Sequence, residues 1–325
     1  MTKLTRAEAA EFLACHDQYL LLTHRRPDGD TLGSAAALCL GLRSLGKTCY
    51  ILENPEITPR FAFLHEGLTR PEAEPEDTLI TVDVASPGML PNSCGKLLDR
   101  VALRIDHHGA ATSFTPREIV DPDSASCAEL VWDILEIMGA SMDARLAEAV
   151  YVGLSTDTGC FRFANTTEHT FATAAKCARA GARLYELNQE LFETNTLGRL
   201  RIQGWIVEHM QLLKAGTLAL VVIPRQVEQE IGVTEDDMDN ISNFPRTVAG
   251  VRMAATLRET ADGTAKLSVR AVPGCDATII ARRFGGGGHK GAAGANMSMP
   301  LAEAAKQVEA ALLELTIHRR AADRS

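Results

Sequence analysis

The apolar run at residues 101–105 leads directly into the tetrapeptide Asp106-His107-His108-Gly109. Its valine, leucine and isoleucine side chains predict a buried strand, and the glycine predicts the turn that follows. In an α/β protein with a parallel sheet, groups at the carboxyl ends of the strands face the ligand crevice. Adjacent histidines diverge in direction, so one can face a metal ion while its neighbour faces a substrate. The sequence therefore predicts an α/β fold with chemistry at this strand end.

A second segment places an imidazole and two carboxylates after an apolar run. Residues 19–23 predict a short strand that leads into His24, and Asp28-Gly29-Asp30 follows before a helix expected at residues 32–45. Asp28 and Asp30 are separated by one glycine, so both carboxylates can turn toward one point. The same motif suits an Asx-turn with an aspartate as helix N-cap, and the sequence alone leaves both interpretations open.

Asp83 and Asp157 extend the pattern to four segments. Residues 78–82 predict a buried strand that ends at Asp83, and a helix expected at residues 143–154 leads into a polar turn around Asp157. Taken singly, each aspartate could belong to a turn. A buried aspartate is costly unless it is paired or binds a cation, and clustered carboxylates repel one another. We therefore expect two divalent ions, with Mn²⁺ or Mg²⁺ suited to carboxylates plus imidazole, at a site for displacement at phosphorus.

Further elements are expected from apolar periodicity and capping residues. In the first half these are a helix at residues 4–16, strands at 47–52 and 118–121, and helices at 126–138 and 167–182. In the second half they are a helical connector at 184–213, a strand at 216–223, and a hairpin of residues 252–258 and 266–270 around Asp262-Gly263.

Four consecutive glycines, Gly285, Gly286, Gly287 and Gly288, precede His289. Glycines admit a backbone that side chains would block, and their N–H groups can converge on an anion. A flexible linker is the alternative for such a run. The histidine and the Ala/Gly segment that follow favour a binding loop.

The charge balance argues against a stable partnership with long nucleic acids. The net charge is −9, from 33 basic and 42 acidic residues, and aromatic residues make up only 5% of the chain. Coating a long strand needs clustered basic residues and aromatic stacking platforms. The eight cysteines show no CxxC spacing, and no apolar run reaches membrane-spanning length. We expect a cytoplasmic protein without membrane contact.

Together the motifs resemble the DHH phosphoesterase superfamily. His24-x3-Asp28-x-Asp30, Asp83, Asp106-His107-His108 and Asp157 are similar to its four motifs in order, and the sequence GGGGHKGAAG at residues 285–294 is similar to the DHHA1 signature. The resemblance covers nearly the whole chain. The short two-domain layout most resembles the branch of nanoRNases and pAp phosphatases, bacterial enzymes that hydrolyse very short oligoribonucleotides and 3′-phosphoadenosine-5′-phosphate (pAp).

The resemblance implies an organisation and an activity. A DHH domain at residues 1–190 would hold a parallel β-sheet and the metal ions. A helical linker at 191–214 would lead to a smaller α/β DHHA1 substrate-binding domain at 215–325, with the active site in the cleft between the domains. The activity would be Mn²⁺-dependent hydrolysis of RNA of about two to five nucleotides, dephosphorylation of pAp, or both, by two-metal activation of a bridging water. A homodimer is compatible with this organisation.

The resemblance also implies roles for individual residues. One ion would take His24, Asp28 and Asp83, and the other Asp30, Asp83, His107 and Asp157, with Mn²⁺ preferred and Mg²⁺ or Co²⁺ as alternatives. Asp106 would orient the histidine pair, and His108 would face the substrate phosphate. The implied substrate-binding residues are Ser268, Arg270, Gly285, Gly286, Gly287, Gly288 and His289. From the sequence alone, Arg270 also fits a solvated strand position.

Four other functions compete with this interpretation. A single-strand exonuclease of the same superfamily would add a further nucleic-acid-binding domain and basic surface. An inorganic pyrophosphatase would lack the glycine-rich domain, and a non-catalytic nucleotide-binding module would have lost metal ligands. A phosphodiesterase for cyclic or linear dinucleotides, such as c-di-AMP, pApA or pGpG, stays open, because stand-alone forms share these motifs.

Overall fold

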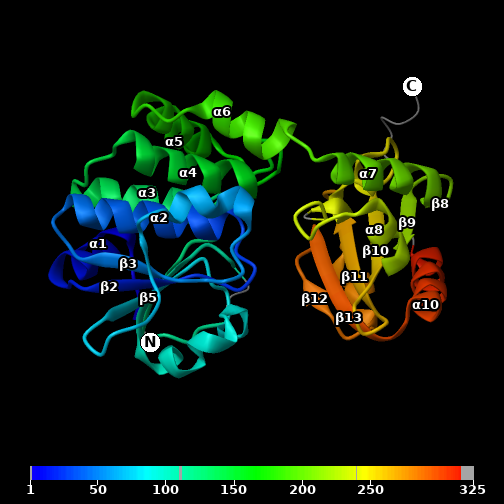
Figure 1. The fold of residues 1–325 in the computed structure, drawn as a ribbon, viewed down its shortest axis with the longest axis horizontal. Helices are drawn as coiled ribbons and strands as arrows, with labels where there is room; N and C mark the ends of the chain where they lie inside the picture. The colour runs from blue at the N-terminus through cyan, green and yellow to red at the C-terminus, as the bar shows by residue number, and fades with distance from the viewer. Residues whose placement is uncertain (1, 110–111, 239, 316–325) are drawn as a thin grey trace. The chain divides into compact units, whose positions relative to one another are not determined.

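The computed structural model describes residues 2–109, 112–238 and 240–315. The chain divides into two compact units, Met1–Thr194 and Asn195–Ser325, which Figure 1 shows as the blue-to-green and green-to-red parts. Among the helices of the described residues, none combines the length and the apolar character needed to cross a membrane.

The first unit is built on a seven-stranded sheet in which every pair of neighbouring strands is parallel. Its strands are β1 (Thr2–Lys3), β2 (Tyr19–Leu22), β3 (Cys49–Leu52), β4 (Thr69–Arg70), β5 (Thr78–Val82), β6 (Val101–Asp106) and β7 (Arg117–Val120). The order across the sheet is β1-β7-β6-β5-β2-β3-β4. The central strands β2 and β5 read as continuous apolar runs because both of their faces are buried.

Helices cover one face of this sheet, as Figure 1 shows for α2, α3 and α4. The helices of the unit are α1 (Arg6–Cys15), α2 (Gly29–Ser44), α3 (Cys127–Met138), α4 (Ala144–Asp157), α5 (Glu168–Arg179) and α6 (Leu184–Asn188). Short 3₁₀ helices at Pro59–His65, Pro87–Met89 and Asn92–Arg100 and a π-helical turn at Gln189–Glu193 complete it. Side chains of Thr5, Ser126 and Asp143 cap α1, α3 and α4, as N-cap residues do.

The order of the strands reverses between β2 and β5. From β2 the chain proceeds to β3 and β4 on one side, and from β5 to β6 and β7 on the other. Connections that diverge in this way leave an open crevice at the carboxyl ends of the two strands, where α/β proteins bind ligands. The segments that follow β2, β5 and β6 carry all candidate residues of the first unit except Asp157, which ends α4.

The second unit has a six-stranded sheet of order β12-β13-β11-β10-β9-β8, in which only β9 and β10 pair in parallel. Its strands are β8 (Gln211–Leu213), β9 (Leu218–Ile223), β10 (Met253–Glu259), β11 (Thr264–Ala271), β12 (Gly287–Gly288) and β13 (Ala292–Pro300). Its helices are α7 (Leu197–His209), α8 (Arg225–Ile231), α9 (Thr278–Arg283) and α10 (Leu301–Glu314), with 3₁₀ turns at Ile241–Asn243 and Pro245–Thr247. The expected α/β class is confirmed, with a parallel sheet first and a smaller α/β unit after it.

The helix expected at residues 184–213 is interrupted. Its first part forms α6 and the π-helical turn, and α7 begins only after Thr196, which caps it. Ile202 and Ile206 of α7 are fully buried in a cluster with Val221 of β9, so this helix packs on the second unit. The hairpin expected around Asp262-Gly263 forms as β10 and β11, with Gly263 at a φ of 78° in its turn.

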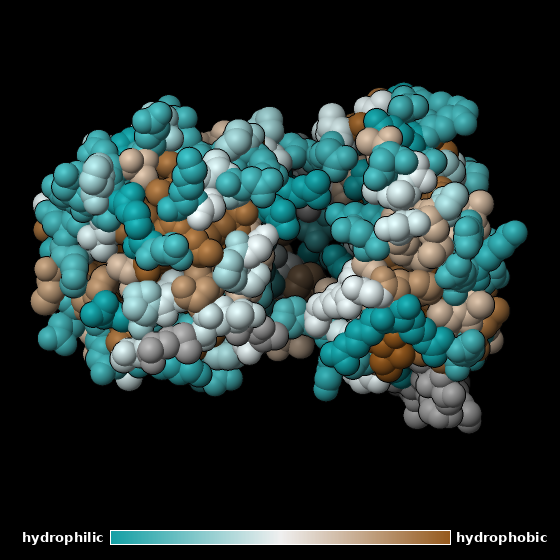
Figure 2. Space-filling view, turned by 90° about the horizontal axis from the view of Figure 1, so that it is seen from below, coloured by the Kyte–Doolittle hydropathy of each residue, from teal (hydrophilic) through white to brown (hydrophobic). Residues whose placement is uncertain are grey.

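Hydrophilic residues dominate the faces of both units that are visible in Figure 2, and smaller hydrophobic areas lie among these residues on each unit. Exposed large apolar side chains occur in both units, for example Ile137 at 54% and Ile279 at 47% exposure. Such side chains are normal on protein surfaces when they are scattered.

Candidate metal centre

Asp83 lies at the carboxyl end of β5, beside the point where the strand order reverses. Its φ of 58° is in the left-handed region, which few residues other than glycine adopt. The backbone N–H of Asp83 donates to the carbonyl of Ile105 (2.9 Å), which ties the turn to β6. The side chain is buried, and its Oδ2 accepts a hydrogen bond from the hydroxyl of Thr31 (2.6 Å). Its Oδ1 is buried and has no hydrogen-bond partner among the residues that the structure describes.

Asp28 and Asp30 lie at the start of α2, which begins at Gly29 rather than at the predicted residue 32. The Oδ1 of Asp28 accepts from the N–H groups of Asp30 (3.1 Å) and Thr31 (3.0 Å), so the N-cap interpretation is correct for this residue. The cap does not exclude ligation, because the His24 Nε2 lies 3.8 Å from the same oxygen.

Asp30 is held by the N-terminus of a second helix. Its Oδ2 accepts from the N–H of Cys127 (2.7 Å), and its Oδ1 accepts from the N–H of Ala128 (2.9 Å), both in the first turn of α3. Helix N-termini stabilise negative charge, so this contact favours the ionised carboxylate. Gly153 of α4 permits the arrangement, because a Cβ there would lie 2.7 Å from Asp30 Oδ1 and 2.4 Å from the Ala128 Cβ.

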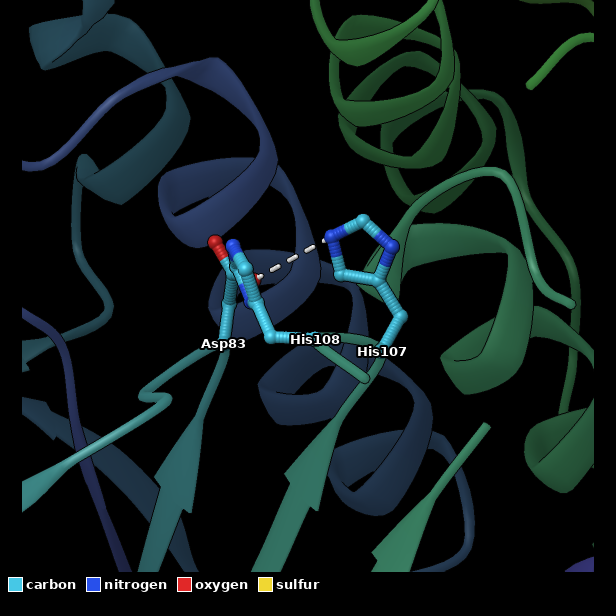
Figure 3. A group of neighbouring side chains, drawn as sticks. All are labelled: Asp83, His107 and His108. Atoms are coloured by element: carbon cyan, nitrogen blue, oxygen red, sulfur yellow. Dashed lines mark ion pairs between the residues drawn. The ribbon is translucent and has the colours of Figure 1, made fainter. Parts of the chain in front are cut away.

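The two histidines that follow β6 have different partners. The Nδ1 of His107 lies 3.2 Å from the carbonyl of Ser124, to which it donates, so Nε2 carries the lone pair that a metal needs. That Nε2 is buried and lies 3.7 Å from Asp83 Oδ1, and within residues 2–109, 112–238 and 240–315 it has no hydrogen-bond partner. Figure 3 shows the ring of His107 pointing toward Asp83 along this ion pair.

His108 is oriented by Asp106. Its Nδ1 lies 2.8 Å from Asp106 Oδ1, which also accepts from the N–H groups of His107 (2.8 Å) and His108 (3.2 Å). The same Nδ1 is 3.4 Å from Asp83 Oδ1. Because a carboxylate accepts its Nδ1 proton, the ring nitrogen that can meet a substrate is Nε2, on the side away from Asp106.

The structure brings all six predicted metal ligands together in two neighbouring groups. His24, Asp28 and Asp83 form one group and Asp30, His107 and Asp157 form the other, each with one donor atom per residue within 4.8 Å of the others. The His107 Nε2 lies 3.7 Å from Asp30 and 3.6 Å from Asp157. These distances are too long for hydrogen bonds. They are compatible with ligation of one ion, because two donor atoms that each lie about 2.1 Å from an ion are at most about 4.2 Å apart. A third group, Asp83, His107 and His108, has the same compactness.

Burial and mutual repulsion act on the carboxylates of this cluster. Burial raises the pKa of Asp83 well above its usual value, and the negative charge of Asp30 raises it further. Burial also raises the pKa of Asp157, again with a contribution from Asp30. The pKa of Asp30 itself is raised by burial, against the opposing effect of His107. A bound divalent cation would reverse these shifts, because its positive charge favours the ionised carboxylates.

Asp106 behaves differently from these three residues. Burial opposes its ionisation, but the hydrogen bond to His108 and the charges of His108 and Arg104 outweigh burial and lower its pKa. Asp106 therefore differs from these three carboxylates in that its hydrogen bond and charged neighbours, rather than burial, determine the direction of its pKa shift. This fits a residue that orients the histidine pair.

The sequence interpretation missed Arg104, the residue that pairs with Asp106. Arg104 is 1% exposed, and its Nη2 lies 3.1 Å from Asp106 Oδ2. Its Nη1 donates to the carbonyl of Thr112 (2.9 Å) and lies 3.5 Å from Oε2 of Glu118 on β7. Thus a buried chain of charges runs from Glu118 through Arg104 and Asp106 to His108. An arginine inside an apolar run was the available signal, because a buried guanidinium needs a carboxylate partner.

In the second unit, strand register brings the predicted substrate-binding residues together. Ser268 of β11 is opposite Gly294 of β13, which is opposite Gly287 of β12. Ser268 and Arg270 lie on the half-buried face of β11, whereas Leu267 and Val269 between them face the core. His289 is joined to Ala292 by two backbone hydrogen bonds, and Arg270 is opposite Ala292 in the register.

Gly287 and Gly288 of the glycine run pair with β13 within the second unit, so the run is not a flexible linker. A Cβ on Gly286 would lie 2.1 Å from the carbonyl of Gly294, and one on Gly288 would lie 2.5 Å from that of Ala292, so close strand approach requires both glycines. The expected convergence of amides on an anion needs correction for Gly285 and Gly286. Their N–H groups donate to the carbonyls of Arg282 and Ala281, respectively.

Comparison with known proteins gives the same division of the chain. Residues 18–154 match the profile described as DHH family, N-terminal domain, and residues 217–316 match that of the DHHA1 domain. The bifunctional oligoribonuclease and PAP phosphatase NrnA of Thermus thermophilus is 34% identical, over 91% of this chain and 90% of its own length. The protein of the same name from Bacillus subtilis is 27% identical, over 90% and 93%.

A solved structure shares the fold. The crystal structure of an exopolyphosphatase-related protein from Bacteroides fragilis superposes with a TM-score of 0.83, at 23% identity, over 95% of this chain and 96% of that chain.

Proposed function

This chain belongs to the DHH family of phosphoesterases and carries a DHHA1 domain, and on that basis we propose that it hydrolyses very short oligoribonucleotides and dephosphorylates pAp. As a member of this family it is a phosphoester hydrolase. The observation that carries the finer proposal is the complete set of clustered carboxylates and imidazoles, in a chain that matches 90% of the length of the Thermus oligoribonuclease and PAP phosphatase.

The clustered residues fit two divalent ions. Asp83 Oδ1 and His107 Nε2 are buried acceptors without a hydrogen-bond partner in the described part of the chain, and such atoms call for an ion or another partner. In our proposal His24, Asp28 and Asp83 hold one ion. Asp83 also reaches the second ion, which the remaining ligands hold: Asp30, His107 and Asp157. Mn²⁺ is the proposed occupant, with Mg²⁺ or Co²⁺ as alternatives, because carboxylates with some imidazole suit these ions.

When bound, such a pair of ions supplies the positive charge that activates water and stabilises the phosphoryl oxygens. The chain's own residues position the reactants. Thr31 fixes the orientation of Asp83, and the carbonyl of Ser124 fixes that of His107. His108, held by Asp106 through Nδ1, can donate a proton from Nε2 to the leaving oxygen.

The second unit would bind the rest of the substrate. Arg270 and Ser268 project from one face of β11, and His289 lies at the turn between β12 and β13. We propose that these side chains contact a phosphate or base away from the scissile bond. A location of the active site between the two domains remains a prediction, as do the predicted domain limits.

We also propose a cytoplasmic location and substrates too short to need an extended track. All eight cysteines are free, as expected in a reducing compartment. The net charge of −9 gives little attraction for the phosphates of a long strand.

The proposal is tested by a hydrolysis panel with added Mn²⁺. The substrates are RNA strands from two to about 24 nucleotides, pAp, c-di-AMP, pGpG and pyrophosphate. We expect kcat/KM to be highest for pAp or for strands of about two to five nucleotides, and to fall with length. An equal or higher kcat/KM on the longest strand would favour an exonuclease, and a preference for c-di-AMP would favour a dinucleotide phosphodiesterase.

A further inference from the structure

A turn of unusual backbone geometry follows Asp157, the last residue of α4. Gly159, Cys160 and Phe161 have φ angles of 57°, 57° and 60°, so three successive residues are left-handed. Residues other than glycine adopt this region at an energetic cost, and such strain is concentrated at ligand-binding and catalytic sites. The turn therefore calls for an explanation beyond the connection of α4 to α5.

The turn is hydrogen-bonded to α4 and to the loop before α3, two segments that also contribute to the metal centre. The N–H of Phe163 donates to the carbonyl of Thr158 (2.9 Å), and that of Cys160 donates to the carbonyl of Ser155 (2.6 Å). The side-chain amide of Asn165 donates to the carbonyl of Asp157 (3.2 Å) and to that of Ala125 (2.9 Å). The loop that contains Ala125 also carries Ser124, whose carbonyl holds His107. Hydrogen bonds thus join the turn to the backbone of Asp157 and to the loop that positions His107. Both residues are candidate ligands of the same ion.

The two phenylalanines of the turn have different surroundings. Phe161 is partly buried, and its ring centroid lies 5.8 Å from that of Tyr151 and 5.4 Å from that of Phe171. Phe163 is 41% exposed, with the tip of its ring on Gly159, where a Cβ would lie 2.3 Å from Cζ. Gly159 therefore lets an exposed aromatic ring lie against the backbone beside Asp157. Arg162 is also exposed, and its Nε donates to the carbonyl of Gly159.

We propose that Phe163, with Arg162 beside it, is a nucleobase-binding platform that stacks on a base next to the scissile phosphate. This proposal rests on the proposed function, because it needs a nucleotide at the centre. An aromatic face binds any base by stacking, and a guanidinium adds attraction for the adjoining phosphate. A single ring fixed beside the centre suits a substrate of few nucleotides, whereas a long strand needs a series of platforms.

The test uses two substrates that differ only in the presence of their bases. One is a 5′-phosphorylated diadenylate, and the other is the same dimer with both bases removed. The variants are Phe163→Ala, Phe163→Leu and Phe163→Trp. Leucine keeps an apolar contact with Gly159 but lacks an aromatic face, and tryptophan restores one. Phe171→Ala is the matched control, because Phe171 is a still more exposed phenylalanine, at 56%, on α5.

We expect Phe163→Ala and Phe163→Leu to raise KM for the diadenylate by about 5- to 100-fold, the range that loss of one base–aromatic contact gives. The value of kcat should change little, and Phe163→Trp and Phe171→Ala should match the wild type. On the abasic dimer all variants should equal the wild type. Three outcomes would overturn the proposal that Phe163 stacks on a base. These are an equal rise in KM on both dimers, a raised KM in the tryptophan variant, and an unchanged KM in the leucine variant.

A binding measurement separates this proposal from the proposed function. Calorimetry with adenosine monophosphate and with ribose 5-phosphate reports the base contribution whether or not the dimer is hydrolysed. If the wild type hydrolyses neither dimer, the proposed function fails. The platform is then supported by weaker binding of adenosine monophosphate to Phe163→Leu than to the wild type, and overturned by equal binding.

Discussion

The two units present their candidate residues in opposite ways. In the first, Asp30 and Asp83 are at most 2% exposed and are held by backbone N–H groups and a hydroxyl. In the second, Arg270 is half-buried and His289 is exposed, on strands whose close approach depends on glycines. A buried cluster of carboxylates is costly until a cation neutralises it, whereas solvated groups cost little when no ligand is bound. We therefore expect the first unit to control metal content and turnover, and the second to control substrate affinity.

The largest effect should come from Asp83→Asn. The variant is nearly isosteric but weakens the one carboxylate that reaches both groups of ligands. We expect kcat to fall by roughly 1,000-fold or more, as when an essential catalytic group is removed. Metal analysis and steady-state kinetics in Mn²⁺ measure this. Activity within a few-fold of the wild type would contradict a shared role for Asp83.

His108→Ala should lower kcat by about 100- to 1,000-fold, in the range of general acid–base catalysis. Its Nδ1 is occupied by Asp106, so the variant should keep the metal content of the wild type. Kinetics and metal analysis on the same preparation separate the two effects. If one ion were lost, His108 would be a ligand, as its proximity to Asp83 also allows.

Arg104 and Glu118 allow a test of positioning inside the first unit. The double variant Arg104→Met/Glu118→Gln removes one positive and one negative charge from the buried chain, so net charge is preserved. We expect kcat to fall about 10- to 100-fold with KM and metal content retained, because Asp106 loses the group that orients it. Glu118→Gln alone, which leaves the Arg104–Asp106 pair intact, is the control.

The same effect should disappear in a His108→Ala background if Arg104 acts through that histidine. A persistent loss of kcat there would show that the buried arginine supports the centre only by its contribution to the fold.

For the second unit, Arg270→Ala and His289→Ala should each raise KM by about 10-fold with kcat nearly unchanged. Arg270 is half-buried and His289 is exposed, so the free energy of unfolding should change little. Kinetics on pAp and on an RNA dimer measure the effect. A fall in kcat at constant KM would remove the contrast between the two units.

The smallest effect concerns stability without metal. The pKa of Asp83 is raised in the folded protein, mainly by burial, so the folded state binds a proton more tightly than the unfolded state does. Stability must then decrease as pH rises from the unfolded pKa, near 3.8, toward the raised value. With a chelator present, Asp83→Asn should therefore have a higher Tm than the wild type at pH 8. The shift should be roughly 2–4 °C for each kcal/mol that the substitution adds to the free energy of unfolding. The difference should vanish near pH 4, and Mn²⁺ should reverse its sign at pH 8.

Most strands of the first unit, and the segments that carry its site, could be predicted from the sequence. The apolar run at residues 78–82 is β5, because a strand buried on both faces needs apolar side chains throughout. The spacing of Asp28, Asp30 and the histidine pair marked the segments that follow two other strands, β2 and β6. Local pattern was sufficient wherever one short segment determines its own environment.

Prediction failed at the ends of helices and where distant segments determine the structure. The start of α2 was placed three residues late, because the side chain of Asp28 caps the helix and lets it begin at Gly29. The helix α4 extends to Asp157 rather than ending at residue 154. Arg104 was missed because its partner Glu118 belongs to another strand. The Ala- and Gly-rich strand β13 lacks the β-branched residues that signal a strand, and it forms through pairing with β11.

The six clustered side chains come from four segments of the chain, from the end of β2 to the end of α4. In folding terms, the centre has a long sequence separation, and parallel pairing of this kind is slow to form. A nascent chain that has emerged only through Asp83 already contains His24, Asp28 and Asp83, but the other group is complete only once α4 has emerged. Binding of an ion by the second group therefore requires that the first unit has folded as far as α4. In the cell, metal uptake would stabilise completed chains selectively, by mass action, over partly folded ones.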